Sequence, residues 1–135
     1  MNLQAQNLQQ HRWKNRLLLI KTESETSAKF QDQLANIKNE NQSLAERKLV
    51  VYQFTGDNFE LTDFREPASN KEGKMSTTLV KKLFRKEATF EVVLIGLDGG
   101  IKLRQTEVLP MKDLYAIIDG MPMRRQELSR RSSGY

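Results

Sequence analysis

Hydrophobic residues gather in short runs that predict β-strands. Three runs of aliphatic, β-branched and aromatic residues stand at 16–21, 49–54 and 90–95. The first has no polar residue between Arg16 and Lys21, which is typical of a strand buried on both faces. A fourth run at 101–104 alternates with charged residues and predicts an outer strand with one solvated face. Asp98–Gly99 predicts a two-residue type I′ hairpin between the last two runs.

Amphipathic stretches between these runs predict helices. Their apolar residues recur every three or four positions, as one buried helix face requires, at about 28–47, 78–86 and 110–119. In the first stretch Asn41 interrupts the apolar stripe, and the second stretch has one apolar and one cationic face. The third starts at Pro110 and stops at Gly120, a residue that commonly caps helix C-termini.

The resulting order is β-α-β-α-β-β-α. It predicts an α/β domain of thioredoxin-like topology, with a four-stranded mixed sheet flanked by helices. Residues 56–77 contain many turn-forming residues and are expected to form a long loop. We expect a flexible arm at 1–11, the thioredoxin-like domain at 12–123 and a basic C-terminal tail at 124–135.

The composition excludes several kinds of chemistry. None of the 135 residues is cysteine, which excludes disulfides, thiol catalysis and thiolate metal sites. His11 is the single histidine, so a multi-histidine metal centre is excluded as well. The longest run of apolar residues and glycine, Val92–Leu97, is far shorter than the about 20 residues of a membrane span. We expect no metal and no cofactor.

Positive charge is concentrated in two segments. The chain carries a net charge of +5, but residues 73–86 alone carry +5 and residues 124–135 carry +3. Such faces attract acidic proteins, glycans, anionic membrane surfaces or nucleic acid, although solvated helix surfaces and frayed termini give the same pattern. Sparse aromatic residues near the cations disfavour nucleic acid. The candidate contact residues are Lys81, Lys82, Arg85, Lys86, Arg124 and Arg125.

Four segments, in this order along the chain, resemble one protein family. They are 13–20 (WKNRLLLI), 44–50 (LAERKLV), 94–104 (LIGLDGGIKLR) and 117–125 (IIDGMPMRR). The set is similar to the bacterial domain-of-unknown-function family that is also found in vertebrate matrix proteins such as equarin and the sushi-repeat proteins. The resemblance extends over about 12–131. It implies a thioredoxin-like, peroxiredoxin-related fold, an exported protein and no established activity.

The segment between the first strand and the first helix corresponds to the dithiol position of a thioredoxin-like fold. Here it holds hydroxyl and carboxylate side chains, and hydroxyls cannot form a disulfide. We interpret this segment as a vestigial active site that now caps the helix. It departs from the more apolar turn common in the family. Its residues are Glu23, Ser24, Glu25, Thr26 and Ser27.

Two further features each have two interpretations. Trp13, the single tryptophan, either packs against the sheet edge or anchors a partner. Met121–Arg125 is either a helix stop with core-filling methionines or an exposed basic corner after a rigid turn.

Together these residues predict a non-catalytic thioredoxin-like binding module. We expect it to belong to an exported protein, periplasmic or extracellular, and to contact an acidic protein, a glycan or a membrane surface. The polar start Met1–Gln6 fits the end of a secretory signal, with Ala5 at the cleavage site, if a leader precedes it. The alternatives are binding of nucleic acid or another polyanion through the same basic faces, and a cysteine-free enzyme of unknown reaction.

Overall fold

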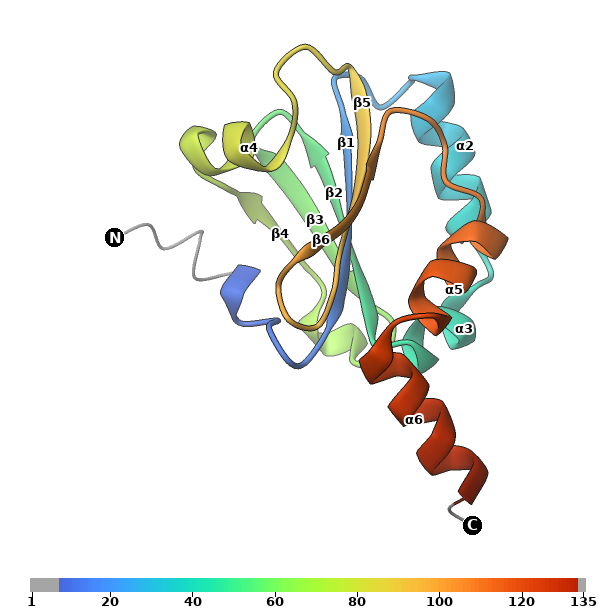
Figure 1. The fold of residues 1–135 in the computed structure, drawn as a ribbon. Helices are drawn as coiled ribbons and strands as arrows, with labels where there is room; N and C mark the ends of the chain where they lie inside the picture. The colour runs from blue at the N-terminus through green and yellow to red at the C-terminus, as the bar shows by residue number, and fades with distance from the viewer. Residues whose placement is uncertain (1–7, 134–135) are drawn as a thin grey trace.

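The computed structural model describes residues 8–133, in which a six-stranded mixed sheet carries helices on both faces (Figure 1). The strands are β1 (Arg16–Thr22), β2 (Leu49–Thr55), β3 (Asn58–Asp63), β4 (Lys71–Lys74), β5 (Phe90–Ile95) and β6 (Ile101–Gln105). Their order across the sheet is β4-β3-β2-β1-β5-β6. The strand β1 is parallel to β2 and antiparallel to β5, and every other neighbouring pair is antiparallel.

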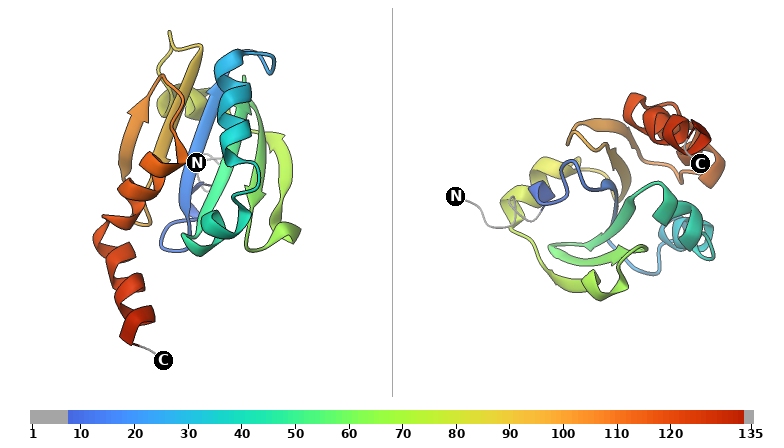
Figure 2. Two further views of the ribbon diagram at one scale, coloured as in Figure 1. Left: turned by 90° about the vertical axis from the view of Figure 1, so that its right-hand side faces the viewer. Right: turned by 90° about the horizontal axis from the view of Figure 1, so that it is seen from below.

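Helices cover the two faces of the sheet unequally (Figures 1 and 2). The helices are α2 (Ala28–Ile37), α3 (Asn41–Glu46), α4 (Thr77–Leu83), α5 (Met111–Asp119) and α6 (Pro122–Ser133). One face is covered by α2, α3 and α5, the other by α4, and α6 extends away from the sheet. Among the helices described, none has the length and apolar character to cross a membrane.

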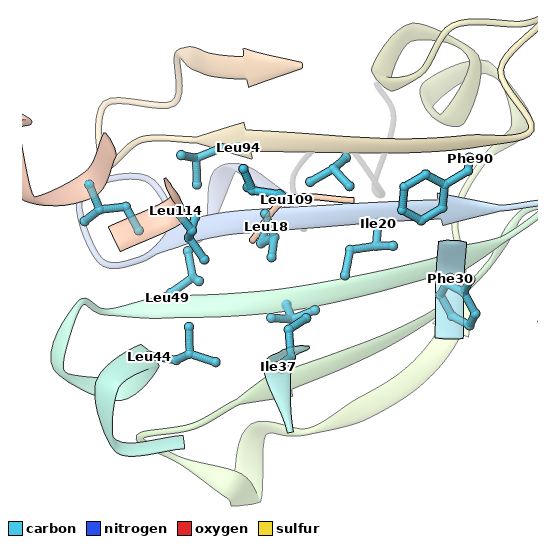
Figure 3. Packing of buried hydrophobic residues seen from close by; sticks show 13 residues of the cluster. Leu18, Ile20, Phe30, Ile37, Leu44, Leu49, Phe90, Leu94, Leu109 and Leu114 are labelled. Atoms are coloured by element: carbon cyan, nitrogen blue, oxygen red, sulfur yellow. The ribbon is translucent and has the colours of Figure 1, made fainter. Parts of the chain in front are cut away.

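The apolar run of β1 supplies side chains to both cores. Leu18 and Ile20 pack under α2, α3 and α5, as Figure 3 shows, whereas Leu17 and Leu19 pack toward α4. Because successive side chains of a strand point to opposite faces, a central strand covered on both sides needs an uninterrupted apolar run. The α/β class and the thioredoxin-like order predicted from the sequence are confirmed.

The expected number of four strands is wrong, because residues 56–77 do not form one long loop. They contain the hairpin strands β3 and β4, joined through a 3-10 turn at Pro67–Ser69. Phe59 and Leu61 alternate inward and are buried against β2, which is the two-residue period of a half-buried strand. The edge strand β4 is exposed throughout and has no apolar pattern to reveal it.

Two local predictions also need correction. The helix expected over 28–47 is two helices, because Asn39 adopts a left-handed φ of 70° and ends the first before Asn41 begins the second. At the β5–β6 hairpin only Gly99 has a positive φ, of 83°, and its N–H donates to Gly96 O at 3.0 Å. Leu97 and Asp98 are therefore the turn centre and Gly99 follows in the left-handed region, which is not a type I′ turn.

Candidate functional site

The C-terminal end of β1 leads directly into the predicted vestigial site. Thr22 Oγ1 donates to Ser24 O at 2.7 Å, and the Ser24 and Thr26 hydroxyls bond each other at 2.8 Å. Ser27 Oγ accepts the N–H of Phe30 at 3.4 Å and caps α2. The hydroxyls of this turn therefore satisfy one another and the helix terminus, as N-terminal capping requires.

A polar pocket of about 780 Å³ opens beside this turn, between it and the β3–β4 hairpin. Glu23 and Glu25 stand on one side, with Glu60 and Glu72 on the strands opposite. Within residues 8–133, no group of three or more histidine or carboxylate side chains gathers closely enough to hold a metal ion. The residues present a broad, exposed acidic surface.

The single histidine is engaged elsewhere. His11 lies before β1, whereas the Ser24 hydroxyl follows its other end, and a strand of this length spans roughly 20 Å. His11 Nδ1 bonds Asn15 Oδ1 at 2.8 Å, and Nε2 bonds the buried Tyr52 hydroxyl at 2.7 Å. Burial lowers the pKa of His11 and raises that of Tyr52. His11, at the end of the arm expected over 1–11, is 7% exposed, while 1–7 lie outside the described residues.

The cationic face predicted on α4 is present and exposed. Lys81, Lys82, Arg85 and Lys86 all face solvent, and their apolar neighbours Leu79, Val80 and Leu83 pack toward the core. Arg85 is the one cation of the four with an ion-pair partner within residues 8–133, since its Nε lies 3.7 Å from Glu91 Oε2. Glu91 is buried and also accepts the backbone N–H of Arg85 at 2.7 Å, which fixes the end of this face.

Arg124 does not lie on an exposed basic face, contrary to the sequence prediction. It is 1% exposed, and its guanidinium bonds three carboxylates at once: Asp119 at 3.0 Å, Glu46 at 3.0 Å and Glu127 at 3.4 Å. Burial by itself lowers the pKa of Arg124, but the bonds to Asp119 and Glu46 outweigh it and raise the pKa. Its neighbour Arg125 is exposed.

A second buried arginine belongs to the same cluster. Arg16 is fully buried at the start of β1, where Nη1 donates to Arg47 O at 2.8 Å and Nη2 lies 3.4 Å from Glu127 Oε2. Arg47 in turn pairs with Asp119 at 2.9 Å. We call Arg16, Glu46, Arg47, Asp119, Arg124 and Glu127 the buried charge cluster. It joins the start of β1, the end of α3 and the α5–α6 junction.

The candidate basic residues form two separate surfaces rather than one. The cations of α4 lie near one end of the sheet, and Arg125 lies at the start of α6 beyond the other end (Figures 1 and 2). The boundary expected between domain and tail at 123/124 falls inside α6, whose first turn holds Arg124 of the buried charge cluster. Side chains of residues 131–135 lie outside the described part of the chain.

The sequence reasoning missed an apolar groove at the N-terminal end of β1. Trp13 does not pack its ring against the sheet, because it is 56% exposed. It lines a groove of about 600 Å³ together with the β5–β6 hairpin and the α5–α6 junction. The sequence indicated this groove only indirectly, because Trp13 and Met121–Arg125 could each be interpreted as exposed at the surface.

Comparison with known proteins supports the fold and identifies the family. Across residues 7–127 the chain matches the domain of unknown function DUF4174. It is 26% identical to coiled-coil domain-containing protein 80 of Danio rerio, over 93% of this chain and 16% of that protein, so it spans about a sixth of this relative. The link to equarin and the sushi-repeat proteins stays a prediction.

Two solved structures share the architecture at low identity. A thioredoxin-fold protein from Helicobacter pylori aligns with a TM-score of 0.56 at 16% identity, over 84% of this chain and 73% of the other. A thioredoxin peroxidase I from Plasmodium yoelii aligns with a TM-score of 0.52 at 15% identity, over 95% and 81%. At such identities the likeness shows the fold alone. The chain is thus a thioredoxin-like domain and belongs to the DUF4174 family of unknown function.

Proposed function

We propose that this domain is a non-catalytic binding module of an exported protein, and that it holds an acidic partner protein or glycan. The contact surface is the exposed cationic face of α4 and the turn after it, which we call the α4 surface. The observation that carries the proposal is that the cations of this segment are exposed to solvent in the folded domain, while its apolar side chains pack in the core. The α4 surface consists of Lys81, Lys82, Arg85 and Lys86.

The chemistry of the β1–α2 turn supports a binding role over thiol exchange. The chain has no cysteine. The hydroxyls of Ser24 and Thr26 are hydrogen-bonded to each other, and that of Ser27 is hydrogen-bonded to the backbone at the α2 N-terminus. The imidazole of His11 is bonded by Asn15 and Tyr52, so it supplies no base to these hydroxyls. The domain therefore presents exposed charge to a partner, which favours a binding role.

The surroundings of the α4 surface favour an acidic protein or glycan over nucleic acid. Base stacking needs exposed aromatic rings beside the cations. The aromatic residue of this segment, Phe84, is buried in the core, and Trp13, the exposed tryptophan, lies at the far end of β1. Arg124 takes no part in this surface because the buried charge cluster holds it.

A charge-reversal experiment tests the proposal with heparin and polyglutamate as probes. The variant Lys81→Glu/Lys82→Glu should bind both probes about tenfold or more weakly than the wild type at low salt. The matched control is Lys38→Glu/Lys112→Glu, which changes the net charge equally and alters exposed lysines near the opposite face of the sheet. The control should keep most of the affinity, as measured by titration across a salt series.

Two results would overturn the proposal. Equal losses in both double variants would mean that the probes sense net charge and not the α4 surface. Binding of single-stranded DNA with a steep salt dependence, without binding of heparin or polyglutamate, would replace the acidic protein or glycan by nucleic acid.

A further inference from the structure

A second surface, separate from the α4 surface, lies at the N-terminal end of β1. The loop before β1, the tip of the β5–β6 hairpin and the α5–α6 junction meet at this end of the sheet (Figure 1) and enclose the groove of about 600 Å³. Apolar side chains form most of its wall, and we call it the Trp13 groove. The apolar residues are Trp13, Leu97, Ile117, Met121, Pro122 and Met123.

The backbone holds Trp13 outward in an unfavourable conformation. Its φ is 69°, in the left-handed region that bulky residues seldom occupy, and its N–H donates to Leu97 O at 2.7 Å. The guanidinium carbon of Arg12 lies 5.2 Å from the ring centre. A large aromatic side chain kept 56% exposed by a strained backbone, beside a 39% exposed Met123, is typical of a contact surface and not of a core.

A buried donor also lines the groove. Arg16 is part of its lining, and although both of its terminal nitrogens are bonded, its buried Nε–H has no hydrogen-bond partner among the described residues. A buried donor without a partner is costly and uncommon in a folded protein. Because this nitrogen is enclosed by the protein itself, its cost belongs to the folded domain and does not select an occupant of the groove.

The charges around the groove define the occupant. Arg12 and Lys14 are exposed on either side of the wall residue Trp13, and the guanidinium of Arg12 lies over its ring. The acids nearby are already paired, Asp98 with Lys102 at 3.1 Å and Asp119 with the arginines of the buried charge cluster. The unbalanced charge at the rim is therefore positive.

We propose that the Trp13 groove binds a short segment of a partner protein in which bulky apolar residues are flanked by acidic ones. The apolar side chains lie against Trp13, Met121 and Met123, and the flanking carboxylates meet the cations of the rim. Aromatic and arginine residues are the side chains that most often dominate the energy of such contacts.

The single tryptophan provides a direct probe, because all tryptophan emission reports on the groove. The full chain is titrated with a capped hexapeptide that has phenylalanine and leucine at its centre and two aspartates on each side. We expect a saturable blue shift of the emission. A peptide with lysines in place of the aspartates should bind about tenfold or more weakly, and an acidic peptide with a serine pair at its centre should give no shift.

Two substitutions distinguish binding in the groove from nonspecific binding to exposed apolar side chains. Met123→Ser removes an exposed wall residue and should weaken the acidic peptide about tenfold while leaving the tryptophan in place. Ile101→Ser is the matched control, because Ile101 is 53% exposed but does not line the groove, and it should leave binding unchanged. Urea unfolding of both variants shows that neither is simply misfolded.

The proposal has defined ways to fail. It is overturned if none of the peptides shifts the emission, if the lysine-flanked peptide binds as well as the acidic one, or if Met123→Ser and Ile101→Ser behave alike. A blue shift that grows with protein concentration in the absence of peptide, together with the mass of a dimer, would replace the partner segment by a second copy of the chain. None of these outcomes depends on the α4 surface, whose variants should bind the peptide normally.

Discussion

The two ends of β1 deal with their polar groups in opposite ways. At the C-terminal end, the hydroxyls of Thr22, Ser24, Thr26 and Ser27 bond within a stretch of a few residues, and those of the turn are exposed or half-buried. At the N-terminal end, arginines are buried and meet carboxylates up to 111 positions away in the chain. A local turn of hydroxyls forms with its own helix, whereas the buried charge cluster forms only when the whole fold is complete.

This contrast locates the part of the domain that is most sensitive to substitution. Removing charges from water is costly, and the cost is offset only if every partner is in place. In a thioredoxin-like fold the reactive end is the C-terminal end of β1. In this chain, however, the buried charge cluster lies at the other end. The Trp13 groove opens there as well, next to Arg16.

The largest expected effect comes from Arg124→Met. The substitution leaves Asp119, Glu46 and Glu127 without the guanidinium that bridges them, and should lower the free energy of unfolding by about 3 kcal/mol. This figure is at the lower end for a buried pair because the carboxylates are partly solvated. Urea denaturation followed by circular dichroism measures it.

Two further variants test whether this effect is specific to the guanidinium of Arg124. Arg125→Met changes an exposed arginine one position further on and should alter stability by about 0.5 kcal/mol or less. Arg124→Lys should fall between the two, because an ammonium group cannot reproduce the planar donor fork that reaches three carboxylates. Equal stabilities of the Arg124 and Arg125 variants would show that the cluster contributes nothing to the fold.

The sequence predicted the ends of β1 unequally for a physical reason. Capping of α2 is a local interaction between neighbours in the chain, and residue type with position was enough to predict that this turn caps the helix. The burial of Arg124 depends on Glu46 and Asp119, which come from α3 and α5 and reach it only through tertiary packing. A charged residue after a helix stop looks the same in a sequence whether it is solvated or enclosed by distant acids.

The same distinction explains the sheet. The strands β1, β2 and β5 consist mostly of apolar residues and were predicted with nearly the observed bounds. The outer strand β4 consists of exposed, largely charged residues and is specified by pairing with β3. The Trp13 groove could not be predicted either, because its walls come from three segments that are distant in sequence.

The pH dependence of stability tests the burial of His11 beside β1. Burial lowers its pKa in the folded state below the about 6.5 of an unfolded chain. The unfolded chain therefore binds a proton first as the pH falls, and the free energy of unfolding drops from about pH 6.5 down to the folded pKa. The slope is at most about 1.4 kcal/mol per pH unit for one proton.

The variant His11→Gln isolates this contribution. It should flatten the stability profile in that window while keeping a side chain that can bond the Tyr52 hydroxyl. The pKa of Asp119 is lowered, although burial opposes this, because Arg47 and Arg124 bond its carboxylate. Its contribution is therefore present above about pH 4 and is lost only below it, whereas the loss from His11 begins at about pH 6.5. An unchanged profile in His11→Gln would contradict the burial of a neutral imidazole.

The smallest expected effect belongs to the C-terminal end of β1. Ser27→Ala removes the one side-chain acceptor at the α2 N-terminus and should cost about 0.5–1 kcal/mol, the lower part of the range for such caps, because the bond to Phe30 N is long at 3.4 Å. Ser24→Ala is the control, since its exposed hydroxyl bonds only within the turn, and it should cost less. Both variants should keep the tryptophan emission of the wild type, because the Trp13 groove lies at the opposite end of the strand. A cost for Ser27→Ala near that of Arg124→Met would mean that this turn is coupled to the core as tightly as the buried charge cluster, and the contrast between the two ends would fail.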